Sequence, residues 1–212
     1  MRMRWHGHAC FEIQDGVTII TDPHDGKSLG IPKPTARANI ILVSHDHFDH
    51  NCTRMVKGLD TEIVSNAGVT RKAGVDMMGF ETFHDETGGS KRGRNTVFRF
   101  ELGGLIFCHM GDLGEVPKDN FFEKLGKVDV LMIPVGNIFT IGAEQARDIA
   151  ARTGARVTVP MHYRVRGLSL SIKPVDDFLS LFPEERISHI GNEIEFLPED
   201  MPGENEVWVF TL

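Results

Sequence analysis

The chain has 212 residues, of which 41% are hydrophobic and 25% are charged, as is ordinary for a globular protein. Its 30 acidic residues exceed its 23 basic ones and give a formal charge of −7, so we do not expect extended nucleic-acid binding. No apolar run approaches the roughly 18 residues of a membrane span, and the N-terminus lacks the apolar core of a signal peptide. We therefore expect a cytoplasmic protein with no membrane partner.

The apolar patterning predicts many short strands before the middle of the chain and strands alternating with helices after it. The expected strands are Arg2–Trp5, Ala9–Gln14, Val17–Thr21, Asn39–Val43, Thr61–Ser65, Asp76–Phe83, Thr96–Glu101, Leu105–Cys108, Asp129–Ile133, Val157–Val159, Ile187–Ile190 and Glu206–Phe210. The expected helices are Asn120–Leu125, Ala143–Arg152 and one near Pro174–Leu181. This order predicts an α/β layered fold with a mixed sheet. No repeat or linker divides the chain, so we expect a single domain over residues 1–212. Its three cysteines include no close pair, and a disulfide framework is not expected.

The segment Ser44–His50 carries an H-x-H-x-D-H pattern directly after the strand expected at Asn39–Val43. Open α/β sheets bind ligands at the carboxyl ends of such strands. His45 and His47 would project to one side, while Asp49 and His50 follow a turn and can face a second centre. Imidazole and carboxylate groups in this arrangement suit a divalent metal ion.

Further candidate ligands follow other expected strands. Asp22 follows the strand expected at Val17–Thr21. Three more candidate ligands follow expected strands later in the chain: His84, Asp112 and His162. Residues distant in sequence can converge in this way on one rim of a sheet.

The order of these motifs resembles the metallo-β-lactamase superfamily, and the resemblance covers nearly the whole chain. The segments Phe83–Asp85, Arg92–Asn95, His109–Gly114, Leu131–Gly136 and Pro160–Tyr163 resemble its branch of small metal-dependent hydrolases, which includes ascorbate-6-phosphate lactonase-like and phospholipase-D-like members. The resemblance implies a four-layer αββα sandwich with a dinuclear metal site. One metal would be bound by His45, His47 and His84, and the other by Asp49, His50 and His162. Asp112 would bridge them, and Asp22 would support the site.

The charge balance of such a site is consistent with hydrolysis. Two divalent ions carry +4, and Asp49 and Asp112 return −2, so the remaining charge favours an anionic substrate. A water held there loses its proton near neutral pH and becomes a bridging hydroxide nucleophile. We expect a small anionic ester, lactone or phosphodiester as substrate, and Zn as the metal ahead of Mn, Fe or Ni. The alternatives are an iron-containing oxidoreductase on the same scaffold and a metal-binding protein without turnover.

Several residues have two interpretations at this stage. Tyr163 either packs against the sheet or donates its hydroxyl to a developing oxyanion. Basic side chains in two loops either are solvated or bind the anionic substrate; they are Lys91, Arg92, Arg94, Arg164 and Arg166. His109 is expected to support a ligand by hydrogen bonding. The sequence leaves open the roles of His6, His8, His24 and Glu115, and whether the chain forms a homo-oligomer.

Overall fold

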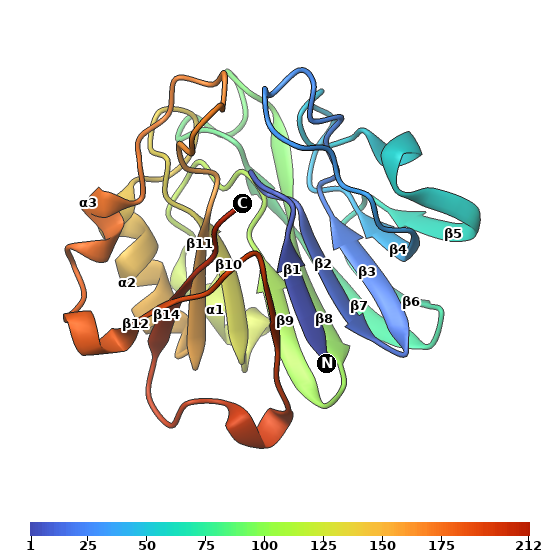
Figure 1. Cartoon of the computed structure of the whole chain (residues 1–212). Coiled ribbons are helices and arrows are strands. Elements are labelled where there is room, and N and C mark those ends of the chain that lie inside the picture. The colour runs from blue at the N-terminus through green and yellow to red at the C-terminus, as the bar shows by residue number, and fades with distance from the viewer.

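The computed structural model describes residues 1–212, which form two β-sheets facing each other (Figure 1). The smaller sheet has the order β13-β1-β2-β3-β4-β5 and the larger one β12-β14-β11-β10-β9-β8-β7-β6. The strands are β1 (Arg2–Trp5), β2 (Phe11–Asp15), β3 (Val17–Thr21), β4 (Ala38–Leu42), β5 (Lys57–Val64), β6 (Gly68–Lys72), β7 (Val75–Phe83), β8 (Arg94–Leu102), β9 (Leu105–His109), β10 (Val130–Pro134), β11 (Val157–Met161), β12 (Ile187–His189), β13 (Glu193–Glu195) and β14 (Glu206–Val209). Both sheets are mixed, as expected.

Strand direction decides which loops meet at the same edge of each sheet. In the smaller sheet β3, β4 and β5 are parallel, and β1 runs the same way because β2 is antiparallel to both β1 and β3. In the larger sheet β9, β10 and β11 are parallel, and β7 shares their direction because β8 is antiparallel to both β7 and β9. The loops that follow β1, β3 and β4 therefore share one edge, as do those that follow β7, β9 and β11.

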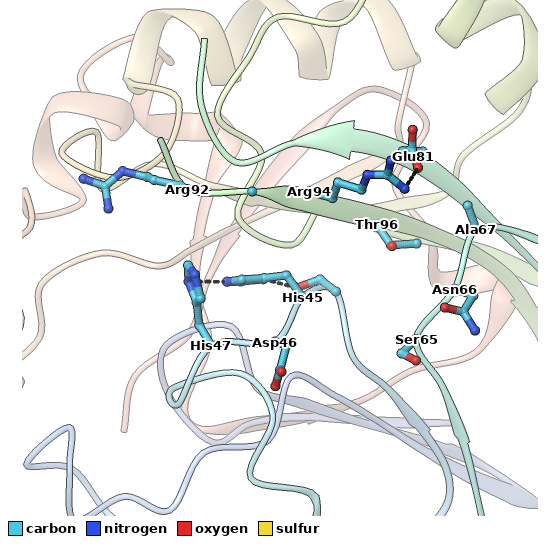
Figure 2. Close-up of a pocket in the computed structure, with 12 residues that line it drawn as sticks. His45, Asp46, His47, Ser65, Asn66, Ala67, Glu81, Arg92, Arg94 and Thr96 are labelled. Atoms are coloured by element: carbon cyan, nitrogen blue, oxygen red, sulfur yellow. Dashed lines mark hydrogen bonds and ion pairs between the residues drawn. The ribbon is translucent and has the colours of Figure 1, made fainter. Parts of the chain in front are cut away.

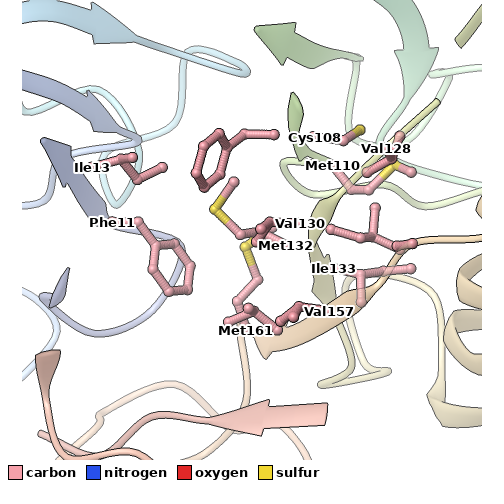
Figure 3. Packing of buried hydrophobic residues seen from close by; sticks show 14 of the residues in the cluster. Phe11, Ile13, Cys108, Met110, Val128, Val130, Met132, Ile133, Val157 and Met161 are labelled. Atoms are coloured by element: carbon pink, nitrogen blue, oxygen red, sulfur yellow. The ribbon is translucent and has the colours of Figure 1, made fainter. Parts of the chain in front are cut away.

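The main hydrophobic core fills the space between the two sheets. Figure 3 shows Phe11 and Ile13 of β2 on one side of this core and Met132 and Met161 of the larger sheet on the other. All four side chains are fully buried. A core of this kind fixes the separation of the sheets and so holds the loops at their edges in place.

Few helices cover the outer faces of the two sheets. The α-helices are α1 (Asp119–Leu125), α2 (Ala143–Thr153) and α3 (Asp176–Leu179), and α2 buries Ala146 and Ile149 against the larger sheet. The smaller sheet is covered outside by a second apolar cluster, packed against Ala36 and Met55, and carries only the 3₁₀-helix Thr53–Met55. The protein thus has a mixed α/β fold of the αββα type, in which two mixed sheets pack together and few helices lie outside them.

Some expected elements differ from the structure in extent. The helix expected near Pro174–Leu181 is only Asp176–Leu179, and the strand expected at Thr61–Ser65 is longer and begins at Lys57. The strands β6 and β13 were not predicted. Both lie at sheet edges and are largely exposed, so they lack the apolar pattern on which the prediction relied. No helix is long and apolar enough to cross a membrane.

Candidate metal centre

The sequence-predicted ligands come together between the carboxyl ends of strands from both sheets. Asp22 follows β3, and the H-x-H-x-D-H segment follows β4. From the larger sheet, His84 follows β7, Asp112 lies three residues after β9, and His162 follows β11. Because these strands share a direction within each sheet, residues more than 100 positions apart in sequence reach one buried cluster.

One group of side chains consists of His45, His47 and His84. His45 Nε2 lies 3.0 Å from His47 Nδ1, which confirms that these two side chains project to one side (Figure 2). The His84 ring lies 4.8 Å from the His45 ring and 5.1 Å from the His47 ring, measured between centroids. Three ligand nitrogens can thus converge on one point.

A second group consists of His8, Asp49, His50 and His162. His8 Nε2 lies 3.0 Å from Asp49 Oδ2 and 3.1 Å from His50 Nε2. Asp49 and His50 thus fall in a different group from His47 and His84. The His45 and His50 rings nevertheless lie 4.3 Å apart, and these two residues form a third candidate group with Asp22. His8 is a member of the second group that the sequence analysis left without a role.

Asp112 lies between the two groups. Its Oδ2 atom is 3.3 Å from His84 Nε2 in the first group, and 3.3 and 3.1 Å from the Nε2 atoms of His50 and His162 in the second. His45 Nε2 is 3.9 Å from the same oxygen. Asp112 Oδ1 is buried and has no hydrogen-bond partner. This placement makes Asp112 the residue able to contact both groups.

Asp22 orients one histidine of each group through hydrogen bonds, His50 directly and His45 by way of Ser44. Its Oδ2 accepts hydrogen bonds from His50 Nδ1 (2.9 Å) and from the Ser44 hydroxyl (2.6 Å), and its Oδ1 accepts one from the Ser44 amide (2.7 Å). Because the Ser44 proton goes to Asp22, Ser44 Oγ accepts from His45 Nδ1, 2.9 Å away. Asp22 thereby orients the rings of His45 and His50, whose Nε2 atoms face the cluster.

The loop that carries Asp112 is held by close backbone contacts. Asn95 Oδ1 accepts a hydrogen bond from the Asp112 amide (2.9 Å), and Asn95 Nδ2 donates to the Met110 carbonyl. His109 donates to the Ala9 carbonyl and accepts from the Gly111 amide, so it supports the backbone and contacts no ligand atom. Gly111 has φ +56, and a Cβ there would meet Asn95 Oδ1 at 2.3 Å. Glycine is required at this position.

The electrostatics of the cluster keep the ligand atoms available. Burial lowers the pKa of His45 to about 3 and that of His84 to about 4, so both imidazoles are neutral at pH 7. Burial acts to raise the pKa of Asp112, but the neighbouring His162 and His50 outweigh it and hold that pKa well below its usual range. Burial acts to lower the pKa of His50, but Asp112, Asp22 and Asp49 outweigh it and hold that pKa well above its usual value, so His50 would release a proton when a metal binds. Neutral imidazole and ionised carboxylate are the protonation states that bind a metal.

The residues fit a divalent cation. Besides Asp112 Oδ1, the Nδ1 atoms of His84 and His162 are buried without a partner, while their Nε2 atoms turn toward Asp112. Buried polar atoms are normally paired, and so many nitrogen and oxygen donors at this spacing repel one another without a cation between them. Imidazoles and carboxylates are the ligands of Zn²⁺ and similar ions.

Two cavities adjoin the first group of histidines. One, of about 440 Å³, is lined by His45, His47, Arg92 and Arg94 among twelve residues (Figure 2), and the other, of about 640 Å³, is lined by His84, Lys91, Arg92 and Glu115 among fourteen. Arg92 lines both. Glu115 accepts a hydrogen bond from the Phe83 amide and so supports the strand end before His84.

The basic residues of this loop differ in how they are paired. Lys91 lies 3.2 Å from Glu86, and Arg94 lies 3.0 Å from Glu81. The Arg92 guanidinium has no carboxylate partner within 4 Å and lies 4.5 Å over the Phe139 ring. Asp85 fixes this segment by accepting hydrogen bonds from the amides of Lys91 (3.0 Å) and Arg92 (2.8 Å).

Three candidate site residues from the sequence do not take the roles expected of them. The interpretation of Tyr163 as an oxyanion donor is wrong, because its hydroxyl donates to the Phe210 carbonyl (2.9 Å) and its ring stacks on Trp5 in the core. Arg164 and Arg166 are exposed and line neither cavity, so the structure does not bring them to the cluster.

Residues 2–162 match the family described as the beta-lactamase superfamily domain, and the chain belongs to this superfamily. A UPF0173 metal-dependent hydrolase of Methanoculleus marisnigri is 30% identical over 187 residues, 77% of this chain and 81% of the relative. A UPF0173 protein of Pyrococcus furiosus is 32% identical over 183 residues, 77% of this chain and 83% of the relative. A Thermotoga maritima structure, whose name assigns it to the Zn-dependent hydrolases of the metallo-β-lactamase superfamily, is 38% identical with a TM-score of 0.82. The match covers 99% of this chain and 97% of that one.

The names of the Methanoculleus relative and of the Thermotoga structure agree on the class of enzyme. The chain is a metal-dependent hydrolase with the metallo-β-lactamase fold, and it contains a His/Asp cluster able to bind metal.

Proposed function

We propose that the chain hydrolyses a small anionic ester, lactone or phosphodiester at a dinuclear metal centre. The observation that carries this proposal is the position of Asp112 Oδ2, which lies 3.1–3.3 Å from histidines of both groups. A carboxylate so placed can bridge two ions. His45, His47 and His84 would hold one ion, and Asp49, His50 and His162 the other.

Zn²⁺ is the ion that best suits this set of imidazole and carboxylate donors. Two such ions, when bound, polarise the electrophilic oxygen of the substrate and lower the pKa of a bound water toward 7. The chain contributes fixed ligand geometry through Asp22 and Asn95, and it contributes two cavities for a substrate beside the histidines of the first group.

Arg92 is the residue best placed to select an anionic substrate. It lines both cavities, it has no carboxylate partner, and Asp85 fixes its backbone. Its planar guanidinium can hold a carboxylate or phosphate group by two parallel hydrogen bonds. Lys91 and Arg94 add positive charge nearby, but Glu86 and Glu81 partly offset it.

The first test is elemental analysis of protein purified without added metal, together with a screen of lactones and phosphodiesters. We expect two metal ions per chain, hydrolysis of an anionic substrate, and loss of that activity when a chelator removes the ions. One ion at full loading would overturn the dinuclear centre. Iron combined with substrate-dependent oxygen uptake would favour the oxidoreductase alternative instead.

The second test compares Arg92→Ala with Arg94→Ala and Arg164→Ala on the substrate that the screen finds. A charge-assisted contact is worth about 1.5–3 kcal/mol, so Arg92→Ala should raise KM about tenfold or more. The controls should change KM less, because Arg94 is paired with Glu81 and Arg164 lines neither cavity. An unchanged KM in Arg92→Ala would remove the claim about substrate charge and leave the metal centre standing.

A further inference from the structure

His8 occupies the same topological position as the predicted metal ligands. It lies three residues after β1, and β1 runs in the same direction as β3 and β4, whose carboxyl ends carry Asp22 and His45. The turn Trp5–Ala9 thus brings one more imidazole to the edge of the smaller sheet where the cluster lies.

The His8 side chain is surrounded by candidate ligands. It is fully buried, and its Nε2 atom lies 3.0 Å from Asp49 Oδ2 and 3.1 Å from His50 Nε2. Its ring packs at a centroid distance of 4.2 Å on the His162 ring and 4.8 Å on the His50 ring. His8 therefore contacts the three residues assigned to the second ion.

The distance between the Nε2 atoms of His8 and His50 is compatible with a metal ion bound by both. His50 donates through Nδ1 to Asp22, so Nε2 is the ring nitrogen that faces His8 and Asp112. The 3.1 Å spacing from His8 Nε2 to His50 Nε2 matches the 3.0 Å spacing within the His45–His47 pair of the motif. Two nitrogens bound to one Zn²⁺ at about 2.0–2.1 Å are separated by a similar distance, about 3.0–3.4 Å.

The backbone at His8 is built to hold this position. His8 has φ +56, in the left-handed region that costs a non-glycine residue about 1–2 kcal/mol. Its carbonyl accepts hydrogen bonds from the His162 amide and from Trp5 Nε1, both at 3.1 Å. Strain that the surroundings maintain in this way is concentrated at functional sites.

We infer that His8 is a ligand of the second metal ion, which the donors of His8, Asp49, His50 and His162 surround together with the bridging Asp112. This inference rests on the proposed dinuclear centre and adds a residue to it. His8 Nε2 would bind the ion, and its Nδ1, which is buried without a partner, would carry the proton.

The test is a Co²⁺ titration of the metal-free protein, comparing wild type with His8→Asn. Asparagine tolerates the left-handed conformation, so this change removes the imidazole with little cost to the turn. The matched control is His24→Asn, because His24 is equally buried and has both ring nitrogens hydrogen-bonded to backbone groups. His8→Gly is the second variant if His8→Asn fails to fold.

We expect wild type and His24→Asn to bind two Co²⁺ ions per chain. His8→Asn should bind the first normally and the second more than 100-fold more weakly, because losing an outer hydrogen-bond partner already costs about 10–100-fold. Proton NMR of Co²⁺-loaded His8→Asn should show one fewer metal-shifted imidazole N–H resonance than Co²⁺-loaded wild type, because the His8 imidazole no longer binds the ion.

Three results would decide against the inference or against its basis. Two ions bound by His8→Asn with wild-type affinity would overturn the ligand role of His8 alone. Weaker binding with every metal-shifted N–H resonance retained would also overturn it, because His8 would then act only by orienting Asp49. A single ion in wild type would instead refute the dinuclear centre on which the proposed function rests.

Discussion

Replacing Asp22 by Asn tests how far the cluster depends on a residue that we do not expect to bind metal. Asp22 is fully buried and accepts three hydrogen bonds, two from Ser44 and one from His50. An amide has one acceptor oxygen, so in Asp22→Asn its NH₂ group must face at least one of these donors. The best orientation keeps the oxygen toward His50 and leaves the buried Ser44 amide unpaired, which costs about 1–3 kcal/mol of folding free energy.

The same change weakens control of the orientation of the two histidine rings. We expect metal affinity to fall about 10–100-fold, as is typical when a ligand loses its outer partner. The measurements are a chelator-competition titration with Zn²⁺ and denaturant unfolding of the metal-free protein. Asp46→Asn is the control, because Asp46 lies in the same motif but is exposed and bonds only Asn51. Metal affinity within twofold of wild type in Asp22→Asn would refute this account of the site.

Three further predictions follow from the packing around the site. Gly111→Ala should lower the free energy of unfolding by more than about 2 kcal/mol, through its positive φ and its clash with Asn95, whereas Gly104→Ala has open space and should cost about 1–2 kcal/mol in denaturant unfolding. Tyr163→Phe should leave kcat unchanged and cost about 0.5–1.5 kcal/mol of stability, and a large loss of kcat would restore a catalytic role. Burial lowers the pKa of His24 to about 4, so the unfolded chain takes up this proton first as the pH falls below about 6.5. Metal-free wild type should therefore lose about 2 kcal/mol more than His24→Asn between pH 7 and pH 5, and equal losses would contradict this.

The sequence predicted the strands that carry a regular apolar signal. Val130–Pro134 and Val157–Met161 are buried along their whole length, and the apolar runs at Asp129–Ile133 and Val157–Val159 predict them. The sequence does not predict Gly68–Lys72, because it is an edge strand with mostly exposed side chains, in which apolar and polar residues need not alternate. The face-to-face pairing of the two sheets came from the resemblance to a known family, because local patterning does not say which strands pack against which.

For the site, the rule that ligands follow strand ends located the H-x-H-x-D-H segment and its distant partners. The same rule places His8, three residues beyond the end of Arg2–Trp5, near the site, but it gives this residue no role. The role of His8 stays open in the sequence because a short turn rich in His and Gly offers no motif of its own. Tyr163 shows the reverse error, since its place beside His162 in sequence does not reveal that its hydroxyl turns into the core.

Backbone strain links these observations. Five non-glycine residues have positive φ, and three of them, His8, Asp22 and His162, lie in or directly behind the cluster. Each costs about 1–2 kcal/mol, and each persists because neighbouring groups hold it. The His162 amide donates to the His8 carbonyl, and Asp22 accepts from both His50 and Ser44. The His162–His8 bond joins the two sheets, and the bonds of Asp22 join two loops of the smaller sheet, so the strain is shared among several loops rather than borne by any single one. The geometry of the site therefore depends on the docking of the two sheets, which is why a motif in one loop could indicate the chemistry but not the full set of ligands.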